Sequence, residues 1–268
     1  MKDVKSINEN SSDLLLSTAQ LAALIVLESG GETSRAEETA TIICRSGGKN
    51  AEAIAFPTGI FITVDDEESH KTTSVARIKE RGVNLHRVER ANSFSRDFAS
   101  GSITLDELNK RLTSLRHEIL YKKLTMLFAT ALSAGAFCVL FEQTLNFVTV
   151  VDFFIAFFAS LASQSVILFT RIRYSYQFAR TFLSSALTAV WAILLMKLFG
   201  AGNVDFVLIG SIFPLLPGLS LTNAVRDTVM GDIVSGTVRI VEAFLIAIAI
   251  AGGVGIVLAS YIGFGGVL

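Results

Sequence analysis

Five apolar stretches follow one another in the second half of the chain, and each is about 20 residues long. A helix of that length rises roughly 30 Å, which is the thickness of the hydrocarbon layer of a bilayer. Because lipid offers the backbone no hydrogen-bonding partner, segments of this kind fold as helices. The sequence therefore predicts five transmembrane helices, in residues 124–141, 147–170, 178–198, 204–229 and 240–262.

Charged residues are concentrated in front of these stretches. Residues 1–117 hold 15 of the 23 Lys and Arg residues and 17 of the 24 Asp and Glu residues, although the whole chain is 51% hydrophobic with a mean hydropathy of +0.55. A water-soluble domain followed by a membrane-embedded one is the simplest explanation of this division. We therefore expect a cytoplasmic domain in residues 1–117 and a five-span transmembrane domain in residues 118–268.

The front part has the alternating signals of a small α+β domain. Gly30 and Gly31 separate two predicted helices, and Thr104 with Glu107 forms a capping box at the start of another. Short runs of β-forming residues are bounded by turn residues. The predicted helices cover residues 12–28, 33–45 and 84–98, and the predicted strands cover residues 51–56, 59–64 and 72–78. The expected fold class is an all-α membrane bundle of five transmembrane helices preceded by a small cytoplasmic α+β domain.

The fourth apolar stretch is interrupted by Pro214, Pro217 and Gly218. Proline removes a backbone donor and collides with the preceding turn, so one straight helix cannot pass through this point. The interruption comes ten residues after Val204, about 15 Å of helix rise or half of the hydrocarbon thickness. In transporters with broken helices, such a point exposes the N-terminus of a half-helix to the substrate. We expect a small anionic or zwitterionic metabolite there, since free N–H groups attract a carboxylate.

Polar residues around this break form the predicted substrate site. The expected substrate-binding residues are Gly218, Ser220, Asn223, Arg226, Asp227 and Gln164. Ionisable groups inside membrane segments are costly and often mark pathways, so Asp227, Asp232 and Glu242 are candidate proton carriers. Two other interpretations stay open. Arg226 with Asp227 could form an interfacial ion pair, and Gln164 could join two helices by a hydrogen bond.

Basic residues occur mainly on one side of the predicted bundle. They precede the first span, fill the link between the second and third, and flank the link between the fourth and fifth: Arg116, Lys122, Lys123, Arg171, Arg173, Arg180, Arg226 and Arg239. The opposite links contain only Lys197. By the positive-inside rule, we expect residues 1–117 in the cytoplasm and Leu268 outside.

Composition and residue spacing argue against several other functions. A net charge of −1 does not favour binding to nucleic acid. The two cysteines suggest no disulfide framework, and we expect neither a metal nor a cofactor. One alternative is a membrane-anchored enzyme whose active site lies in the cytoplasmic domain, and another is a scaffold or sensor without transport activity. The best candidates for such an active site are Glu32, Arg35, Glu37 and His86.

Several stretches, in order along most of the chain, resemble the threonine/serine exporter family, in particular its N-terminal half. They are residues 30–38 (GGETSRAEE), 56–58 (FPT), 84–85 (NL), 87–88 (RV), 101–108 (GSITLDEL), 221–232 (LTNAVRDTVMGD), 235–236 (SG) and 242–243 (EA). The resemblance implies a bacterial inner-membrane exporter of small hydrophilic metabolites, threonine and serine in the named members. Split members are similar to a succinate exporter that works with a second, smaller membrane subunit. Ser34 departs from the bulkier residue expected in the family's Glu-Thr-x-Arg motif.

The sequence thus predicts a transporter subunit and not an enzyme. Its substrate would be a small carboxylate-bearing metabolite, either threonine or serine or a succinate-like dicarboxylate. Full-length family members carry a second membrane half, whereas this chain stops after five predicted spans. We therefore expect the subunit to be embedded in the lipid bilayer of the bacterial inner membrane. There it would work with a second membrane subunit or as a homo-oligomer, and without nucleic acid.

Overall fold

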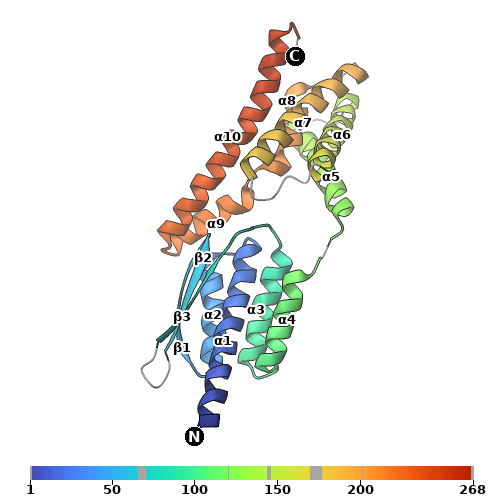
Figure 1. Cartoon of the computed structure of the whole chain (residues 1–268). Coiled ribbons are helices and arrows are strands. Elements are labelled where there is room, and N and C mark those ends of the chain that lie inside the picture. Colours follow the sequence, from blue (N-terminus) through green and yellow to red (C-terminus); the bar gives the residue numbers. More distant parts are fainter. Residues whose placement is uncertain are drawn as a thin grey trace. The chain divides into compact units, whose positions relative to one another are not determined.

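The computed structural model describes residues 2–65, 71–119, 121–143, 146–169, 177–200 and 202–266, with the backbone alone for residues 2–11 and 169. Most of this part of the chain is helical, and a small sheet lies near the N-terminus (Figure 1). The chain forms two compact units: one combines Met1–Glu118 with Leu219–Val241, and the other combines Ile119–Gly218 with Glu242–Leu268. Arg171 and Arg173, which contribute to the predicted orientation, lie outside the described residues.

The first unit begins with helices and strands that agree with those predicted, except that α1 starts ten residues before the predicted residue 12. The helices are α1 (Lys2–Glu28), α2 (Thr33–Ser46), α3 (Leu85–Ala99) and α4 (Leu105–His117), and the strands are β1 (Asn50–Phe56), β2 (Gly59–Asp65) and β3 (Lys71–Arg77). Asn84 caps α3 by accepting the N–H of Arg87 at 3.1 Å, and Thr104 caps α4 by accepting the N–H of Glu107 at 3.3 Å. The predicted cap at Thr104 is therefore confirmed.

The three strands form an antiparallel sheet in the order β1-β2-β3. One face packs against α1 and α2, so alternate residues of β2 such as Ile60 and Ile62 are fully buried. The other face is exposed. Across it, Ile54 pairs with Phe61, and Phe61 pairs with Val75.

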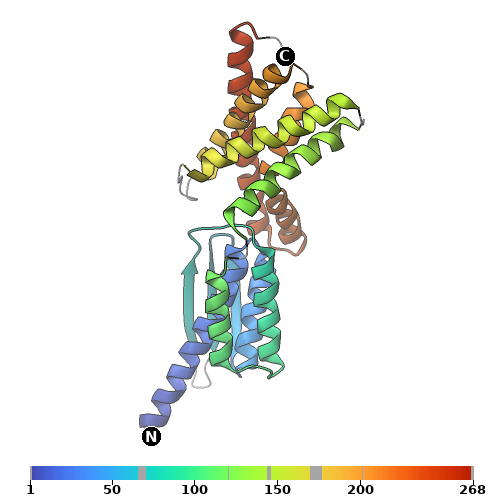
Figure 2. The same ribbon diagram turned by 90° about the vertical axis from the view of Figure 1, so that its right-hand side faces the viewer.

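The hydrophobic core of the first unit is built around α1, which packs against α2, α3 and α4 (Figures 1 and 2). Ile25 of α1, Ile43 of α2 and Leu108 and Leu112 of α4 are almost completely buried in it. A central helix with neighbours on several sides needs apolar residues around most of its circumference. The long apolar run in the second half of α1 meets this need.

The second unit contains the long apolar helices. They are α5 (Lys123–Glu142), α6 (Phe147–Phe169), α7 (Gln177–Phe199) and most of α10 (Ile233–Gly263), together with the short α8 (Val204–Ile212). Figure 2 shows α5 and α6 side by side. These two helices approach closely at Gly135, where a Cβ would come within 2.8 Å of the Phe153 ring. Small residues of this kind let apolar helices pack tightly in lipid.

By length and hydropathy, α5, α6, α7 and α10 are four candidate membrane spans. The bent pair formed by Val204–Leu215 and α9 (Gly218–Val229) would make a fifth. The predicted break is present in this pair, since α8 ends at Ile212, a 3₁₀ turn covers Phe213–Leu215, and α9 begins at Gly218. The chain is therefore a multi-pass membrane protein with four or five candidate spans.

Residues 219–241 pack with the first unit, whereas the expected division assigned all of residues 118–268 to the transmembrane domain. They pack there because Asn223 and Arg239 donate hydrogen bonds to backbone carbonyls of the first unit. In addition, α10 begins at Ile233 and not near Ile240, because the Asp232 side chain accepts the N–H of Ser235 at 3.1 Å and so starts the helix earlier.

Candidate functional site

The loop between α1 and α2 presents two backbone carbonyl groups to side chains from a distant part of the sequence. Gly30 has a φ of +82°, which residues with a side chain rarely adopt. Gly31 lies so close to Val26 that a Cβ would come within 2.8 Å of the Val26 carbonyl oxygen. The Gly30 carbonyl accepts a hydrogen bond from Asn223 Nδ2 at 2.8 Å, and the Gly31 carbonyl accepts one from Arg239 Nη2 at 2.8 Å.

The donors belong to a helical hairpin made of α9 and the start of α10, residues 219–241, which we call the α9–α10 hairpin. Asn223, Asp227 and Arg239 are only 5%, 1% and 5% exposed. Arg239 Nε lies 2.8 Å from Asp227 Oδ2, so an ion pair buried from water joins α9 to α10. Asp227 Oδ1 receives no hydrogen bond from the described residues. The hairpin thus turns a charged side toward the loop that contains Gly30 and Gly31, which we call the glycine loop.

The contacts of Asn223, Asp227 and Arg239 form what we call the polar network. At its edge, Glu32 is shared between two arginines. Its Oε1 lies 2.5 Å from Arg226 Nη1 and 3.7 Å from Arg35 Nη2. The side chains of Arg226 and Arg35 are 52% and 35% exposed, whereas that of Glu32 is 13% exposed. Guanidinium groups bind carboxylates through two parallel hydrogen bonds. This edge can therefore hold a small acid from solution in competition with Glu32.

Two more acids near the network have opposite shifts in pKa. Burial raises the pKa of Glu37; the N–H of Ala55, donated to Glu37 Oε1 at 2.7 Å, opposes this rise, and the charges of Asp232 and Asp227 add to it. Burial also acts to raise the pKa of Asp232, but hydrogen bonds from Ser235, together with the Thr33 hydroxyl and the charge of Arg239, outweigh it and the pKa is lowered. Glu37 therefore holds a proton more tightly than an exposed glutamate, and Asp232 holds one less tightly than an exposed aspartate.

The network brings together four of the predicted site residues, all in the first unit: Asn223, Arg226, Asp227 and Asp232. Sequence reasoning did not place Arg239 or the carbonyls of Gly30 and Gly31 in the site. Arg239 did leave a signal, because an arginine inside an otherwise apolar helix requires a partner. The two carbonyls left none, since every residue has one.

The remaining predicted site residues lie elsewhere. Gly218 and Ser220 stand in the first turn of α9, where Gly218 is exposed and Ser220 is half-buried. Gln164 of α6 donates a hydrogen bond from Nε2 to Ser184 Oγ of α7 at 2.9 Å, so the interpretation of Gln164 as a link between helices has a physical basis here. Glu242 is half-buried on α10 and begins the part of that helix that belongs to the second unit.

Hydroxyl groups continue the contact between α6 and α7. Thr188 Oγ1 donates to Ser163 Oγ at 2.8 Å, and both side chains are almost completely buried. Nearer the start of α6, the two carboxylate oxygens of Asp152 each lie 3.1 Å from the N–H of Asn203, which precedes α8. These bonds satisfy polar groups inside an apolar bundle and fix how its helices pair.

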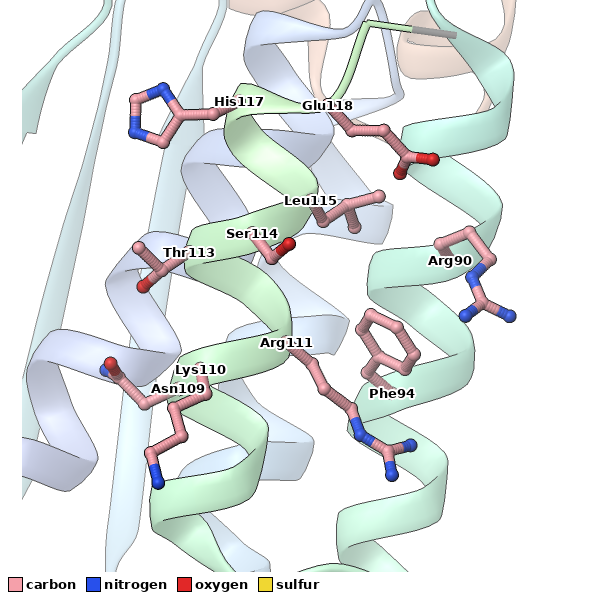
Figure 3. Close-up of a pocket in the computed structure, with 10 residues that line it drawn as sticks. All are labelled: Arg90, Phe94, Asn109, Lys110, Arg111, Thr113, Ser114, Leu115, His117 and Glu118. Atoms are coloured by element: carbon pink, nitrogen blue, oxygen red, sulfur yellow. The ribbon is translucent and has the colours of Figure 1, made fainter.

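A separate hollow lies on the surface of α3 and α4, and Figure 3 shows the residues that line it. Arg90 and Arg111 lie over the Phe94 ring, with their guanidinium carbons 4.6 Å and 5.7 Å from its centroid. His117 points away from Arg90 and Phe94 (Figure 3). The lining is basic, and among its residues no base lies in contact with a nucleophile.

The enzyme interpretation relied on four residues, and three of them, Glu32, Arg35 and Glu37, lie on the loop and first turns of α2 beside the polar network. Within the part of the chain that the structure describes, no hydrogen bond or ion pair joins His86 to these three. The same part holds no group of three or more His, Cys, Asp or Glu residues that could bind a metal ion. No contact seen here favours an enzyme over a transporter.

Comparison with known proteins places the chain in a family. Residues 17–261 match the ThrE family, described as "Putative threonine/serine exporter". The chain is also 24% identical over 237 residues to the "Probable succinate transporter subunit YjjP" of Klebsiella aerogenes, an alignment that covers 87% of this chain and 88% of that relative. No solved structure matches significantly. Because the family match extends over both compact units and includes the polar network, the chain belongs to the threonine/serine exporter family.

Proposed function

We propose that the chain is a subunit of an exporter in the bacterial inner membrane that moves small carboxylate-bearing metabolites out of the cell. The family is named for threonine and serine, and the similar protein of Klebsiella aerogenes is named for succinate and as a subunit. All three compounds carry a carboxylate. The subunit would work with a second membrane subunit or with further copies of itself.

The observation that carries this proposal is the open edge of the polar network. Arg226 and Arg35 keep exposed guanidinium groups beside the less exposed Glu32. A substrate carboxylate that takes the place of Glu32 at Arg226 would release one of the contacts between the α1–α2 loop and α9, while the hydrogen bond from Asn223 to Gly30 remains. Asn223 and Asp227 lie along the same side of α9, and Gly218 and Ser220 form its first turn. Substrate binding would therefore act directly on the helix that follows the break.

A proton could be exchanged at acidic residues in this network or further along α10. Asp227, Asp232 and Glu242 are the candidate carriers from the sequence, and Glu37 joins them because burial raises its pKa. An acid with a raised pKa gains and loses a proton closer to neutral pH, which suits a carrier. Gln164, in the second unit, would line a later part of the path.

Residues 204–218 would form an unusually short crossing. Because residues 1–118 and 219–241 share one compact unit, we place them on the same side of the membrane. If α5, α6 and α7 cross three times from the cytoplasm outward, the chain must return between Val204 and Gly218. The α-helical, 3₁₀ and extended residues there span about 26 Å in total, slightly less than the hydrocarbon thickness. A short, proline-broken crossing is a natural place for a gate.

Export assays on arginine variants would test the proposed site. Cells that express the chain with and without a candidate second subunit would be loaded with labelled threonine or succinate. Arg226→Ala should abolish export while the protein stays in the membrane, and Arg226→Lys should restore part of it because the positive charge remains.

The matched control is Arg111→Ala, since Arg111 is another partly exposed arginine of the first unit and also pairs with a glutamate, Glu107. This control should export normally. Normal export by Arg226→Ala would show that the assigned site is wrong. Failure of the unmodified chain to export either compound, with or without the second subunit, would contradict the proposed function itself.

A further inference from the structure

The α9–α10 hairpin has an apolar side as well as a charged one. Asn223, Asp227 and Arg239 are buried in the polar network, but the opposite side of the hairpin is exposed. Six of its exposed apolar residues lie on α9, on the turn and at the start of α10, and we call them the apolar face: Leu221, Val225, Val229, Met230, Ile233 and Val234. Val238, Ile240 and Val241, further along α10, are exposed as well. Within the apolar face, Val229 is 80% exposed and Leu221, the most covered, is still 47% exposed.

The spacing of these residues makes α9 an amphipathic helix. Leu221, Val225 and Val229 are four residues apart, so they form one stripe along the helix. Asn223 and Asp227, which share the spacing of four, lie on the side that is buried. Residues 219–241 are all described and hold four charged side chains, of which only Arg226 is exposed. One side of the hairpin therefore packs against protein, and the other is left uncovered by the residues that the structure describes.

The chain itself indicates what covers the apolar face. The hairpin follows the apolar segment Val204–Leu215, with which α9 forms a bent pair, and at its last residue it continues into the part of α10 that belongs to the second unit. Both ends thus pass into segments that suit the hydrocarbon layer. Its charged side, however, packs on a unit with a water-soluble composition. A helix meets both demands when it lies at the membrane surface.

We propose that the α9–α10 hairpin lies in the interfacial layer of the membrane, with lipid as the partner of its apolar face. An amphipathic helix in this position sinks about 5–10 Å into the boundary between headgroups and acyl chains. The hairpin is then a surface anchor for the first unit, and α9 is not part of a helix that crosses the bilayer. The membrane-crossing part of α10 starts near Glu242, after the end of the hairpin.

Spin labels on single cysteines would test this position in the full chain. The native Cys44 and Cys138, both buried, would first be replaced by alanine. Labels would then be attached to Val225→Cys or Val229→Cys, with Ser102→Cys as the control. Ser102 is exposed in the turn after α3, a helix that begins beside the glycine loop, where the N–H of Asn84 bonds the Ser29 carbonyl. The control therefore lies at the far end of that helix from the hairpin.

Each purified variant would be reconstituted alone into vesicles of phosphatidylethanolamine and phosphatidylglycerol. Oxygen concentrates in lipid, and a nickel chelate stays in water, so collisions with each report the surroundings of the label. We expect frequent oxygen collisions and a loss of nickel collisions at residues 225 and 229, with the reverse at residue 102.

Two results would overturn the proposal. Nickel collisions at residues 225 and 229 equal to those at residue 102 would place the apolar face in water. Infrequent collisions with both reagents would mean that protein covers it. Because the vesicles contain no second subunit and no transport is measured, the outcome does not depend on whether the chain exports carboxylates.

Discussion

Asp227 and Arg239 carry opposite charges in a place that water hardly reaches. Their exposed fractions are 1% and 5%, and Arg239 Nε lies 2.8 Å from Asp227 Oδ2. Their attraction offsets the loss of hydration only while both are present, because a single buried charge keeps the whole desolvation penalty. The pair therefore constrains the hairpin to one arrangement more than it adds net stability.

Replacing one member of this pair should destabilise the chain more than replacing both. Asp227→Asn or Arg239→Gln leaves an unpaired buried charge, which costs about 3–5 kcal/mol, whereas the double variant leaves none. In thermal unfolding of the full chain in detergent, each single variant should lower Tm clearly, and the double variant should recover much of the loss. If the two losses simply add, the side chains do not interact.

Glu37 should make stability depend on pH. Burial raises its pKa above 4.5, so the folded chain binds a proton more tightly than the unfolded chain does. The free energy of unfolding therefore decreases as pH rises from about 4.5 through the raised pKa, and the protonated form is the favoured one. Glu37→Gln removes this titration and keeps an oxygen for the N–H of Ala55, so the variant should be more stable than the unmodified chain near pH 7.

The measurement is Tm between about pH 5 and about pH 7.5. The unmodified chain should lose stability over this range relative to Glu37→Gln. Glu38→Gln, a change at an exposed neighbour, should behave like the unmodified chain. Parallel pH profiles for Glu37→Gln and the unmodified chain would show that Glu37 does not titrate in this range.

At the scale of the elements, α10 contains glycines in two different surroundings. A Cβ on Gly236 would meet the Thr228 hydroxyl and come within 2.9 Å of the Ala224 carbonyl oxygen, both on α9. A Cβ on Gly255 would meet nothing within 4 Å. The first glycine lets two helices approach, and the second has no such role.

Alanine at these two positions should have opposite effects. Gly236→Ala should lower Tm, since the two helices of the hairpin must separate at a cost of about 1–3 kcal/mol. Gly255→Ala should leave Tm unchanged or raise it, because alanine favours a helix by up to about 1 kcal/mol. Equal effects of the two changes on Tm would mean that the helices are not in contact at Gly236.

The starts of α3 and α4 were predicted from the sequence with little error, whereas α1 begins ten residues before its predicted start. Asn84 and Thr104 are the N-caps of α3 and α4, and each side chain accepts a free N–H of the first turn. The starts of these helices therefore depend only on nearby residues. The start of α10 was predicted too late. The continuous apolar run begins near Ile240, but the helix already starts at Ile233, where the Asp232 side chain accepts the N–H of Ser235.

At the scale of the whole molecule, the topology depends most on which side of the membrane holds residues 219–241. They share a compact unit with residues 1–118, so residues 204–218 must cross the bilayer if α5, α6 and α7 do. Alkaline phosphatase, which is active only outside the cytoplasm, can report the two sides. A fusion after Gly202 should be active, and a fusion after Gly231 should be inactive. Equal activities would contradict a crossing between them.

The polar site shows where sequence reasoning stopped. Arg226, Asp227, Asn223 and Asp232 were singled out because charged and polar groups are costly in apolar surroundings, and this needs no knowledge of their neighbours. The proposal that the half-helix after the break meets a substrate halfway through the bilayer, with these residues further along it, depended on depth. In the structure these residues belong to the first unit, and Asn223 and Arg239 bind the glycine loop there.

The sequence by itself determined the apolar spans, the strands and the cap at Thr104, and it determined that the fourth apolar stretch is broken. These features depend on hydrogen bonds and burial within a few residues, so they can be read locally. Only the tertiary structure decided that Arg239 meets the carbonyl of Gly31, 208 residues earlier in the chain, and pairs with Asp227 beneath it. Such a contact depends on how whole helices pack, because the partner of a buried charge is set by which groups the fold places beside it.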